Sequence, residues 1–331
     1  MKKLINKPED VVTESLEGFL AMYGELYEKI PGANGILYKN RGNDRVAFLV
    51  GGGSGHEPLF TLFVGENLAD ASVAGNIFAS PDPFSICEAA HAVDMGRGIV
   101  FFYGNYAGDI MNFDMAVEML EAEGIKCRTI RMNDDVASAP HERINDRRGI
   151  AGDILAVKIG GAVTSAGLSL DECERVITKA KNSIRSIGIA LSPGTLPGAS
   201  APPFVLGPNE VEFGMGIHGE PGIRRAPLQS ADETVEILLD EILKDMPLTS
   251  EDEVCTLING LGSTTLMELL ILNRKLKMLL DNKGIRIHAM EAGSYCTTQE
   301  MAGMSISIMK LDEELKRYYD LPAYSPYYSK R

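Results

Sequence analysis

The chain has 331 residues and a mass of 35.9 kDa, which at about 150 residues per domain predicts two domains and a sizeable buried core. Apolar residues make up 45% and charged residues 24%, so the composition excludes a disordered chain and argues against a membrane protein. The formal net charge is −14 and the sequence contains no long basic run, which argues against a nucleic-acid partner.

The first half alternates helical patterns with short apolar runs. Apolar residues at helical spacing follow Pro8, and two apolar runs each end in a turn of Gly or Asn. In chain order, the predicted elements are a helix at 8–28, a strand at 45–50, a helix at 84–94, a strand at 98–105, a helix at 115–124 and a strand at 126–132. This alternation predicts an α/β sheet covered by helices.

The second half begins after an amphipathic helix at 169–185, because residues 191–230 are rich in Gly and Pro and have little helical period. We therefore expect a domain boundary near residue 186, which gives domains at 1–185 and 186–331. The later predicted elements are a helix at 234–246, a strand and turn at 253–260, a helix at 265–284, strands at 285–290 and 304–311, and a loose terminus at 324–331. The predicted fold is two α/β domains, each a mainly parallel or mixed sheet covered by helices.

The cysteines and the apolar runs bear on the cellular compartment of the protein. The five cysteines are odd in number, far apart and never in a CxxC pair, so reduced thiols fit better than a disulfide framework or a zinc site. The N-terminal segment reaches Pro8 and acidic residues before any apolar stretch, and the longest apolar runs are too short to span a bilayer. We expect a cytoplasmic protein that is neither secreted nor membrane-inserted.

The segment GGGSGHEP, residues 51–58, follows a predicted strand, where ligands bind in open α/β sheets. It is not a Walker A loop, because His56 and Glu57 stand where Lys and Ser or Thr are required, and the dinucleotide fingerprint would need a glycine at position 56. Two interpretations remain. The loop binds a small oxygen-rich ligand with His56 as a polar group, or it is a tight structural turn.

The segment GMGIHG, residues 214–219, has the spacing of a nucleotide fingerprint but lacks its context. Pro221 and Gly222 prevent the helix that would receive a pyrophosphate, so we reject a nucleotide cofactor here. His218 lies between small residues in a tight, exposed loop where its imidazole could meet a ligand. The alternative is an ordinary packed or surface histidine, although HGEPG echoes GHEP of the first loop.

Acidic and hydroxyl residues also stand near predicted element ends. Asp109 ends GNYAGD, on the same rim as His56, and is a candidate for a functional carboxylate or a helix cap. Capping or solvation is favoured over metal binding for the acidic turn at 133–136. Other helix-start candidates are Ser263, Thr264 or Thr265 and the capping box at 297–300, and the remaining histidines (His91, His141, His288) are interpreted as structural.

Taken together, GGGSGHEP, FASP at 78–81, GNYAGD with NF, RRGIAG at 147–152 and GMGIHGEPGI resemble the substrate-binding subunit of dihydroxyacetone kinases, the DhaK family. The resemblance runs in order through INGLGSTTLMEL and MAGMSISIMKLD. It implies two α/β domains, a homodimer, and a ketose held as a hemiaminal on a histidine ring nitrogen, here that of His218. It also implies Asp109 as general base, His56 as the group that binds substrate and stabilises the transition state, and Gly53 and Ser80 as lining of the pocket.

The implied chemistry is physically consistent. Neutral imidazole can add to a ketone or aldehyde carbon but not to an alcohol carbon, so covalent capture on His218 would separate dihydroxyacetone from glycerol. A carboxylate with an ordinary pKa of about 4 is a weak base toward an alcohol. In a loose phosphoryl-transfer transition state the base is needed late, so Asp109 is adequate if it is well positioned.

The sequence offers no nucleotide or metal site, so a partner must supply the phosphoryl group. Members of the family that are complete kinases in one polypeptide carry a further ATP domain. The resemblance implies a separate DhaL-type subunit that holds ADP or ATP with magnesium. This subunit is recharged in one branch by a DhaM-type phosphotransferase-system protein, and another branch uses free ATP.

One position departs from the family pattern. Most members carry a lysine immediately before NYxGD, where this chain has Gly104. If that lysine hydrogen-bonds the substrate oxygens or screens the incoming phosphate, its absence weakens the interaction with dihydroxyacetone by about 1–3 kcal/mol, the scale of one charged hydrogen bond. Two alternatives to a dihydroxyacetone kinase subunit therefore stay open, namely a kinase subunit for a four-carbon sugar such as erythrulose, and a non-catalytic coactivator that senses ketose.

Overall fold

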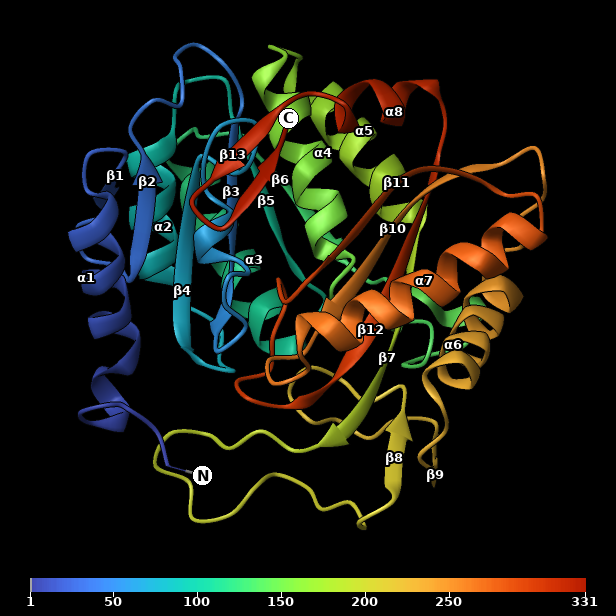
Figure 1. Cartoon of the computed structure of the whole chain (residues 1–331). Coiled ribbons are helices and arrows are strands. Elements are labelled where there is room, and N and C mark those ends of the chain that lie inside the picture. Colours follow the sequence, from blue (N-terminus) through green and yellow to red (C-terminus); the bar gives the residue numbers. More distant parts are fainter. Residues whose placement is uncertain (1) are drawn as a thin grey trace. The chain divides into compact units, whose positions relative to one another are not determined.

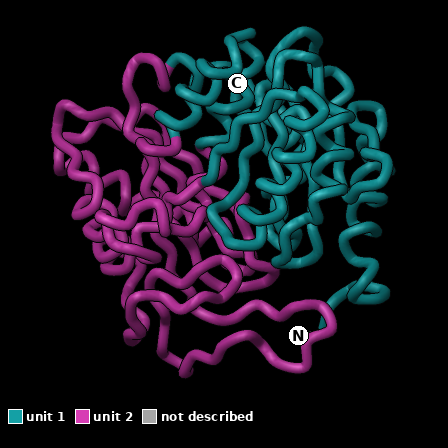
Figure 2. Tube along the Cα trace, turned by 180° about the vertical axis from the view of Figure 1, so that it is seen from behind, with its two compact units in different colours: residues 1–131, 156–180, 317–331 teal, residues 132–155, 181–316 magenta. Residues whose placement is uncertain are grey.

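The computed structural model describes residues 2–331 and divides them into two compact units, which Figure 2 colours teal and magenta. Unit 1 contains the chain up to Arg131, Ala156–Ala180 and Arg317–Arg331, and unit 2 contains Met132–Leu155 and Lys181–Lys316. The division therefore differs from a single boundary near residue 186. Local composition could not reveal it, because Met132–Leu155 joins unit 2 through long-range backbone bonds such as Val136 N–H to Ser186 O, 2.9 Å.

Unit 1 is built on a six-stranded mixed sheet in the order β1-β2-β4-β3-β5-β6 (Figure 1). Its strands are β1 (Tyr27–Lys29), β2 (Gly35–Tyr38), β3 (Ala47–Ser54), β4 (Ala71–Ile77), β5 (Ile99–Gly104) and β6 (Cys127–Met132). Strand β3 pairs parallel with both β4 and β5, whereas β2 pairs antiparallel with β1 and β4. The three central strands therefore end at one edge of the sheet.

Helices α2 (Pro83–Val93) and α3 (Ala107–Ala122) pack on each other, and their buried residues form a core with those of β3, β4 and β5. Helix α2 begins where its sequence predicts, because the Asp82 carboxylate accepts from Phe84 N and Ser85 N and Pro83 fits the first turn. Further helical segments of the chain are η1 (Pro8–Asp10), α1 (Val11–Tyr23), η2 (Thr61–Phe63), α4 (Asp153–Ser165) and α5 (Leu170–Asn182).

Unit 2 is built on a second six-stranded sheet, in the order β11-β10-β12-β7-β8-β9, in which only β10 and β11 pair parallel. Its strands are β7 (Ile184–Ser192), β8 (Glu210–Phe213), β9 (Arg224–Pro227), β10 (Glu253–Gly260), β11 (Arg286–Gly293) and β12 (Ala302–Leu311). With two mixed sheets, each packed against helices, the predicted α/β class is confirmed.

Helices α6 (Ala231–Asp245) and α7 (Leu266–Asn282) pack side by side on the second sheet (Figure 1). Each begins with a capping box, Ser230 with Glu233 for α6 and Thr265 with Glu268 for α7, so Thr265 is the N-cap among the three candidates. The remaining helices are η3 (His141–Asp146) and α8 (Glu313–Tyr319). No helix of residues 2–331 is both long and apolar enough to cross a membrane.

Two local predictions are wrong. No helix begins at Thr297; instead Thr298 and Glu300 form an isolated bridge, and Glu300 Oε1 accepts from Thr195 N at 3.0 Å. The C-terminal segment is not loose. It forms a hairpin of β13 (Ala323–Ser325) and β14 (Tyr328–Lys330). The Nζ atom of Lys330 lies 4.2 Å from the centre of the Tyr319 ring.

Candidate active site

Three loops of unit 1 leave the same edge of its sheet. They follow β3, β4 and β5, which are parallel neighbours, and the carboxyl ends of parallel strands share one edge. The predicted residues His56, Ser80 and Asp109 stand on these loops or at the start of the helix that follows. The structure therefore brings these three residues to one rim of unit 1.

The loops after β3 and β4 are fastened to each other through their backbones. Phe78 N donates to Ser54 O at 2.9 Å, and Ser54 Oγ donates to Gly75 O at 2.7 Å. A Cβ on Gly53 would lie 2.8 Å from Ala79 N, so a side chain at position 53 would push the loops apart. The loop packing therefore requires a glycine at position 53. The contact of Gly53 with substrate is still a prediction.

The imidazole of His56 is buried and held flat against an aromatic ring. His56 is 2% exposed, and its ring stacks on Phe78 with centroids 4.8 Å apart and planes 22° apart. Phe78 has a positive φ of 57°, in the left-handed region that few non-glycine residues adopt. The structure thus fixes the plane of this imidazole rather than leaving it free to rotate.

Asp109 is buried in the first turn of α3. It is 8% exposed, and it is the third residue of the helix, whose N-cap is Tyr106. The predicted alternative that Asp109 caps this helix is therefore wrong. The helix dipole favours the ionised carboxylate at this position.

Ser80 and Gly104 lie next to the start of α3, the helix that carries Asp109. A Cβ on Gly108 would lie 3.6 Å from Ser80 Cβ, and Asn112 Nδ2 donates to Pro81 O at 2.8 Å, so the loop after β4 rests on the start of α3. Gly104 is the buried last residue of β5, and its carbonyl accepts from Tyr106 N at 2.8 Å. Position 104 thus leads directly into the turn that places Asp109.

His218 belongs to unit 2, on the turn between the antiparallel strands β8 and β9. No helix follows this turn, which agrees with the rejected nucleotide fingerprint. The sequence predicts an exposed loop here, and the His218 side chain is 23% exposed and thus half-buried. Its Nδ1 lies 3.0 Å from Glu220 Oε1, and its backbone N–H donates to Glu220 Oε2 at 3.0 Å.

The acidic turn at 133–136 has a structural role. The Asp134 carboxylate accepts from Ile150 N at 2.8 Å and Gly152 N at 2.9 Å, and the Asp135 carboxylate is paired with Arg148. Burial raises the pKa of Asp135 to about 6 in spite of the guanidinium beside it. Across residues 2–331, no group of three His, Cys, Asp or Glu side chains is arranged to hold a metal ion.

Comparison with known proteins identifies the family. The Dak1 domain matches residues 17–327. The chain is 42% identical over 330 residues to "PTS-dependent dihydroxyacetone kinase 2, dihydroxyacetone-binding subunit DhaK" of Listeria innocua, covering 99% of both proteins. The chain belongs to the DhaK family.

Two further relatives of this DhaK-family chain bear different names. An L-erythrulose kinase of Pectobacterium atrosepticum is 39% identical over 335 residues, covering 100% of this chain and 56% of that longer protein. A solved structure named a dihydroxyacetone kinase operon co-activator, DhaQ, superposes with a TM-score of 0.88 at 31% identity, covering 94% of this chain and 96% of the other. Family membership therefore leaves both substrate and activity to be tested.

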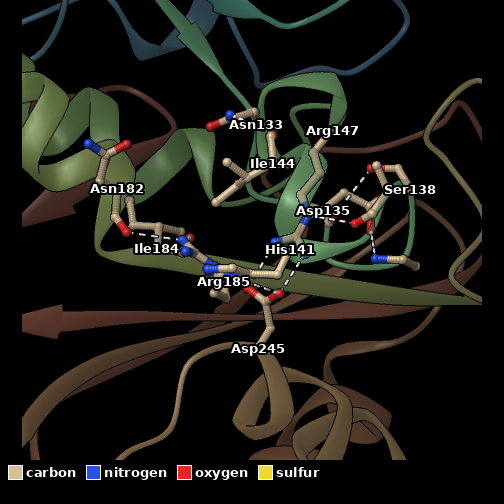
Figure 3. A network of polar contacts seen from close by, with 12 residues as sticks. Asn133, Asp135, Ser138, His141, Ile144, Arg147, Asn182, Ile184, Arg185 and Asp245 are labelled. Atoms are coloured by element: carbon tan, nitrogen blue, oxygen red, sulfur yellow. Dashed lines mark hydrogen bonds and ion pairs between the residues drawn. The ribbon is translucent and has the colours of Figure 1, made fainter.

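The DhaK-family motif RRGIAG contributes a network that the sequence did not reveal (Figure 3). Arg147 is 1% exposed and forms a bidentate ion pair with Asp245. The distances are 2.8 Å from Nη1 to Oδ2 and 2.5 Å from Nη2 to Oδ1. Arg185 Nε also donates to Asp245, at 2.5 Å, and His141 Nδ1 lies 3.3 Å from the same carboxylate. The sequence shows the two adjacent arginines but not their partner. Asp245 lies about a hundred positions further along the chain, so local pattern does not connect it with Arg147.

We expect Asp245→Asn to lower the free energy of unfolding by about 3 kcal/mol at neutral pH, because it leaves two buried guanidinium groups without their carboxylate. Burial raises the pKa of Asp245, but hydrogen bonds and charge from Arg147 and Arg185 outweigh this and hold it well below its usual range. This stabilisation is therefore present above pH ~4 and is lost as the pH falls further.

Urea unfolding followed by circular dichroism at several pH values measures this loss. The matched control is Asp232→Asn on the same helix, where an exposed pair with Arg274 should contribute less than about 1 kcal/mol. Equal stability of the two variants would contradict the assigned role, as would a gap between wild type and Asp245→Asn that does not narrow in acid.

Proposed function

We propose that this chain is the ketose-binding subunit of a phosphotransferase that acts on an alcohol group. A short ketose, dihydroxyacetone in the first instance, is held as a hemiaminal on His218 and phosphorylated on its terminal hydroxyl. The observation that carries the proposal is the half-buried His218 ring, which is held through Nδ1 by a carboxylate in a chain of this family. A neutral, oriented imidazole is the nucleophile that such a capture needs.

The proposed phosphoryl transfer uses unit 1. Asp109 accepts the proton of the substrate hydroxyl, and His56 binds the substrate and stabilises the transition state. The shared rim of these side chains and their burial support these roles, since positioning provides most of the catalysis in phosphoryl transfer. The remaining proposed contacts to the sugar are made by Gly53, Ser80 and Gly104.

The proposed phosphoryl donor is a partner. A relative of the same length is named a binding subunit, whereas the L-erythrulose kinase is nearly twice as long, which supports a division of labour between chains. We propose a DhaL-type subunit that carries ADP or ATP with magnesium and either is recharged by a DhaM-type phosphotransferase-system protein or uses free ATP. A homodimer in the cytoplasm completes the proposal, and the five buried cysteine thiols fit a reducing compartment.

Two other candidate functions are each favoured by an observation. Gly104 supports a four-carbon substrate such as erythrulose, because it replaces a long cationic side chain at the end of β5. The match to the co-activator DhaQ supports a ketose sensor that binds but does not transfer phosphate. A sensor would need His218 but not a working Asp109.

A substrate panel separates these functions. The chain is mixed with a DhaL-type subunit and a phosphoryl source, and phosphate-ester formation is followed for dihydroxyacetone, both erythrulose enantiomers, glyceraldehyde and glycerol. We expect turnover of at least one ketose and none of glycerol, which has no carbonyl to capture. Covalent capture of ketose without any turnover would replace the kinase proposal by the sensor, and turnover of glycerol would contradict carbonyl capture.

We expect Gly104→Lys to raise the kcat/KM for dihydroxyacetone relative to the kcat/KM for erythrulose. The expected change in this ratio is about 5- to 150-fold, the equivalent of one charged hydrogen bond. The same panel measures the ratio. Gly18→Lys is the matched control, because a Cβ at that helical position meets nothing within 4 Å. An unchanged ratio in Gly104→Lys would remove position 104 from the determinants of substrate size.

A further inference from the structure

The turn that carries His218 also supplies a carboxylate to its ring, that of Glu220. Gly216 N donates to Glu220 O at 3.0 Å, which closes the turn and brings the Glu220 side chain back onto it. A Cβ on Gly216 would lie 2.1 Å from Glu220 Oε2, so the carboxylate occupies the space that a side chain at position 216 would fill. The closed backbone of the turn therefore holds the Glu220 carboxylate close to His218.

The Glu220 carboxylate decides which ring nitrogen of His218 carries the proton. An ionised carboxylate only accepts hydrogen bonds, so the contact of 3.0 Å between His218 Nδ1 and Glu220 Oε1 requires a proton on Nδ1. A neutral imidazole has one N–H, and the lone pair then lies on Nε2. Burial alone would raise the pKa of Glu220, but the hydrogen bond from His218 and the nearby charge of Arg148 act against burial and favour the ionised carboxylate.

Arg148 links this carboxylate to the interior of unit 2. Its Nη1 lies 3.9 Å from Glu220 Oε2, and its Nη2 donates to Gly214 O, at the start of the same turn, at 3.1 Å. The guanidinium is held in turn by Asp135, which is 1% exposed and accepts from Nε at 3.1 Å and Nη2 at 2.7 Å. A buried acid thus anchors the arginine that faces both the carboxylate and the backbone of the turn.

We infer that Glu220, with Arg148 and Asp135 behind it, is a positioning residue that holds His218 as the Nδ1–H tautomer, so that Nε2 bonds to the carbonyl carbon of the substrate. The inference rests on the proposed capture by His218. When Nε2 adds, an N–C bond forms and the carbonyl π pair moves to oxygen, which takes a proton from water. The Nδ1 proton can pass to Glu220 and on to water, so one proton is taken up and one is released.

Two measurements on Glu220→Ala and Glu220→Gln test this role. The first is the rate of adduct formation with dihydroxyacetone, followed by rapid mixing and intact-mass spectrometry. The second is the nitrogen-15 NMR signature of the His218 tautomer without ligand. Removing the carboxylate or carbonyl partner of a metal-bound histidine costs about 10- to 100-fold, and we expect adduct formation in Glu220→Ala to slow by a similar factor.

The NMR signature should show Nδ1–H in the wild type and a shift toward Nε2–H in Glu220→Ala, a change that loss of packing alone would not produce. Glu210→Gln is the matched control, because Glu210 is also a partly exposed glutamate of unit 2 paired with an arginine, Arg225. Arg148→Lys, which keeps the charge but loses the fork, should give a smaller slowing than Glu220→Ala.

The outcomes separate the two claims. Absence of an adduct in the wild type would overturn the proposed capture, and the tautomer measurement would then still test the positioning role by itself. Equal adduct rates in wild type and Glu220→Ala would overturn the positioning role while leaving capture intact. An Nε2–H tautomer in the wild type would also overturn it, whether or not the variants fold.

Discussion

Replacing His218 by alanine is expected to abolish covalent capture of ketose. The wild-type chain incubated with dihydroxyacetone should gain the mass of one sugar in an intact-mass measurement, and His218→Ala should gain none, because no other group supplies the nucleophilic nitrogen in the proposed mechanism. Phosphoryl transfer should fall with it, since the substrate is no longer held in place.

The matched control for this variant is His288→Ala. His288 is the third histidine of unit 2, with His141 and His218, and lies 3.5 Å from Glu253, in a half-buried pairing that the proposed chemistry does not use. It should keep both the adduct and the activity. An adduct that survives in His218→Ala would show that another residue, His56 first of all, makes the bond.

Asp109→Asn is expected to separate capture from transfer. The adduct should form as in the wild type, because Asp109 takes no part in carbonyl addition, whereas phosphate-ester formation should fall by about 10²- to 10⁴-fold with loss of the general base. Intact-mass spectrometry and the coupled assay with the partner subunit measure the two steps on the same sample.

Asp114→Asn provides the control on the same helix. Asp114 follows Asp109 in α3 by little more than one turn and pairs with Arg131 at 2.5 Å, with about half of its side chain exposed. Its replacement should leave both steps within a factor of about two, the range of ordinary surface changes. Full transfer activity in Asp109→Asn would contradict a base at this position.

The elements predicted correctly have one apolar face or a clear apolar run. The segment 253–260, predicted as a strand and turn, is strand β10 throughout, and α7 begins one residue later than predicted. Helix α4, by contrast, was missed because it is buried on nearly every side and shows no apolar period. A Cβ on its Gly160 would lie 2.4 Å from the Phe48 ring, so this glycine reflects close packing rather than a turn.

The short or small-residue strands of unit 1 were also missed. Strand β2 has four residues, and β4 consists largely of small residues, so neither offers the apolar run that marked β3. Their positions follow from pairing with strands distant in sequence. Local pattern alone does not contain that information.

The candidate site shows the same limit. The motifs containing His56, Asp109 and His218 are local, and turns rich in glycine at strand ends mark them in the sequence. Glu220 could have been found as an acid two positions after His218 in a tight turn. Arg148 could not, because its contact with the turn joins residues more than sixty positions apart.

Nuclear magnetic resonance on the bound sugar shows whether His218 captures the ketose covalently. Dihydroxyacetone labelled with carbon-13 at its carbonyl carbon is added to the chain labelled with nitrogen-15 in histidine. The account predicts a saturated carbon signal with one-bond coupling to Nε2 of His218, lost in His218→Ala and kept in His288→Ala. A bound sugar whose labelled carbon shows no coupling to a histidine nitrogen would contradict covalent capture.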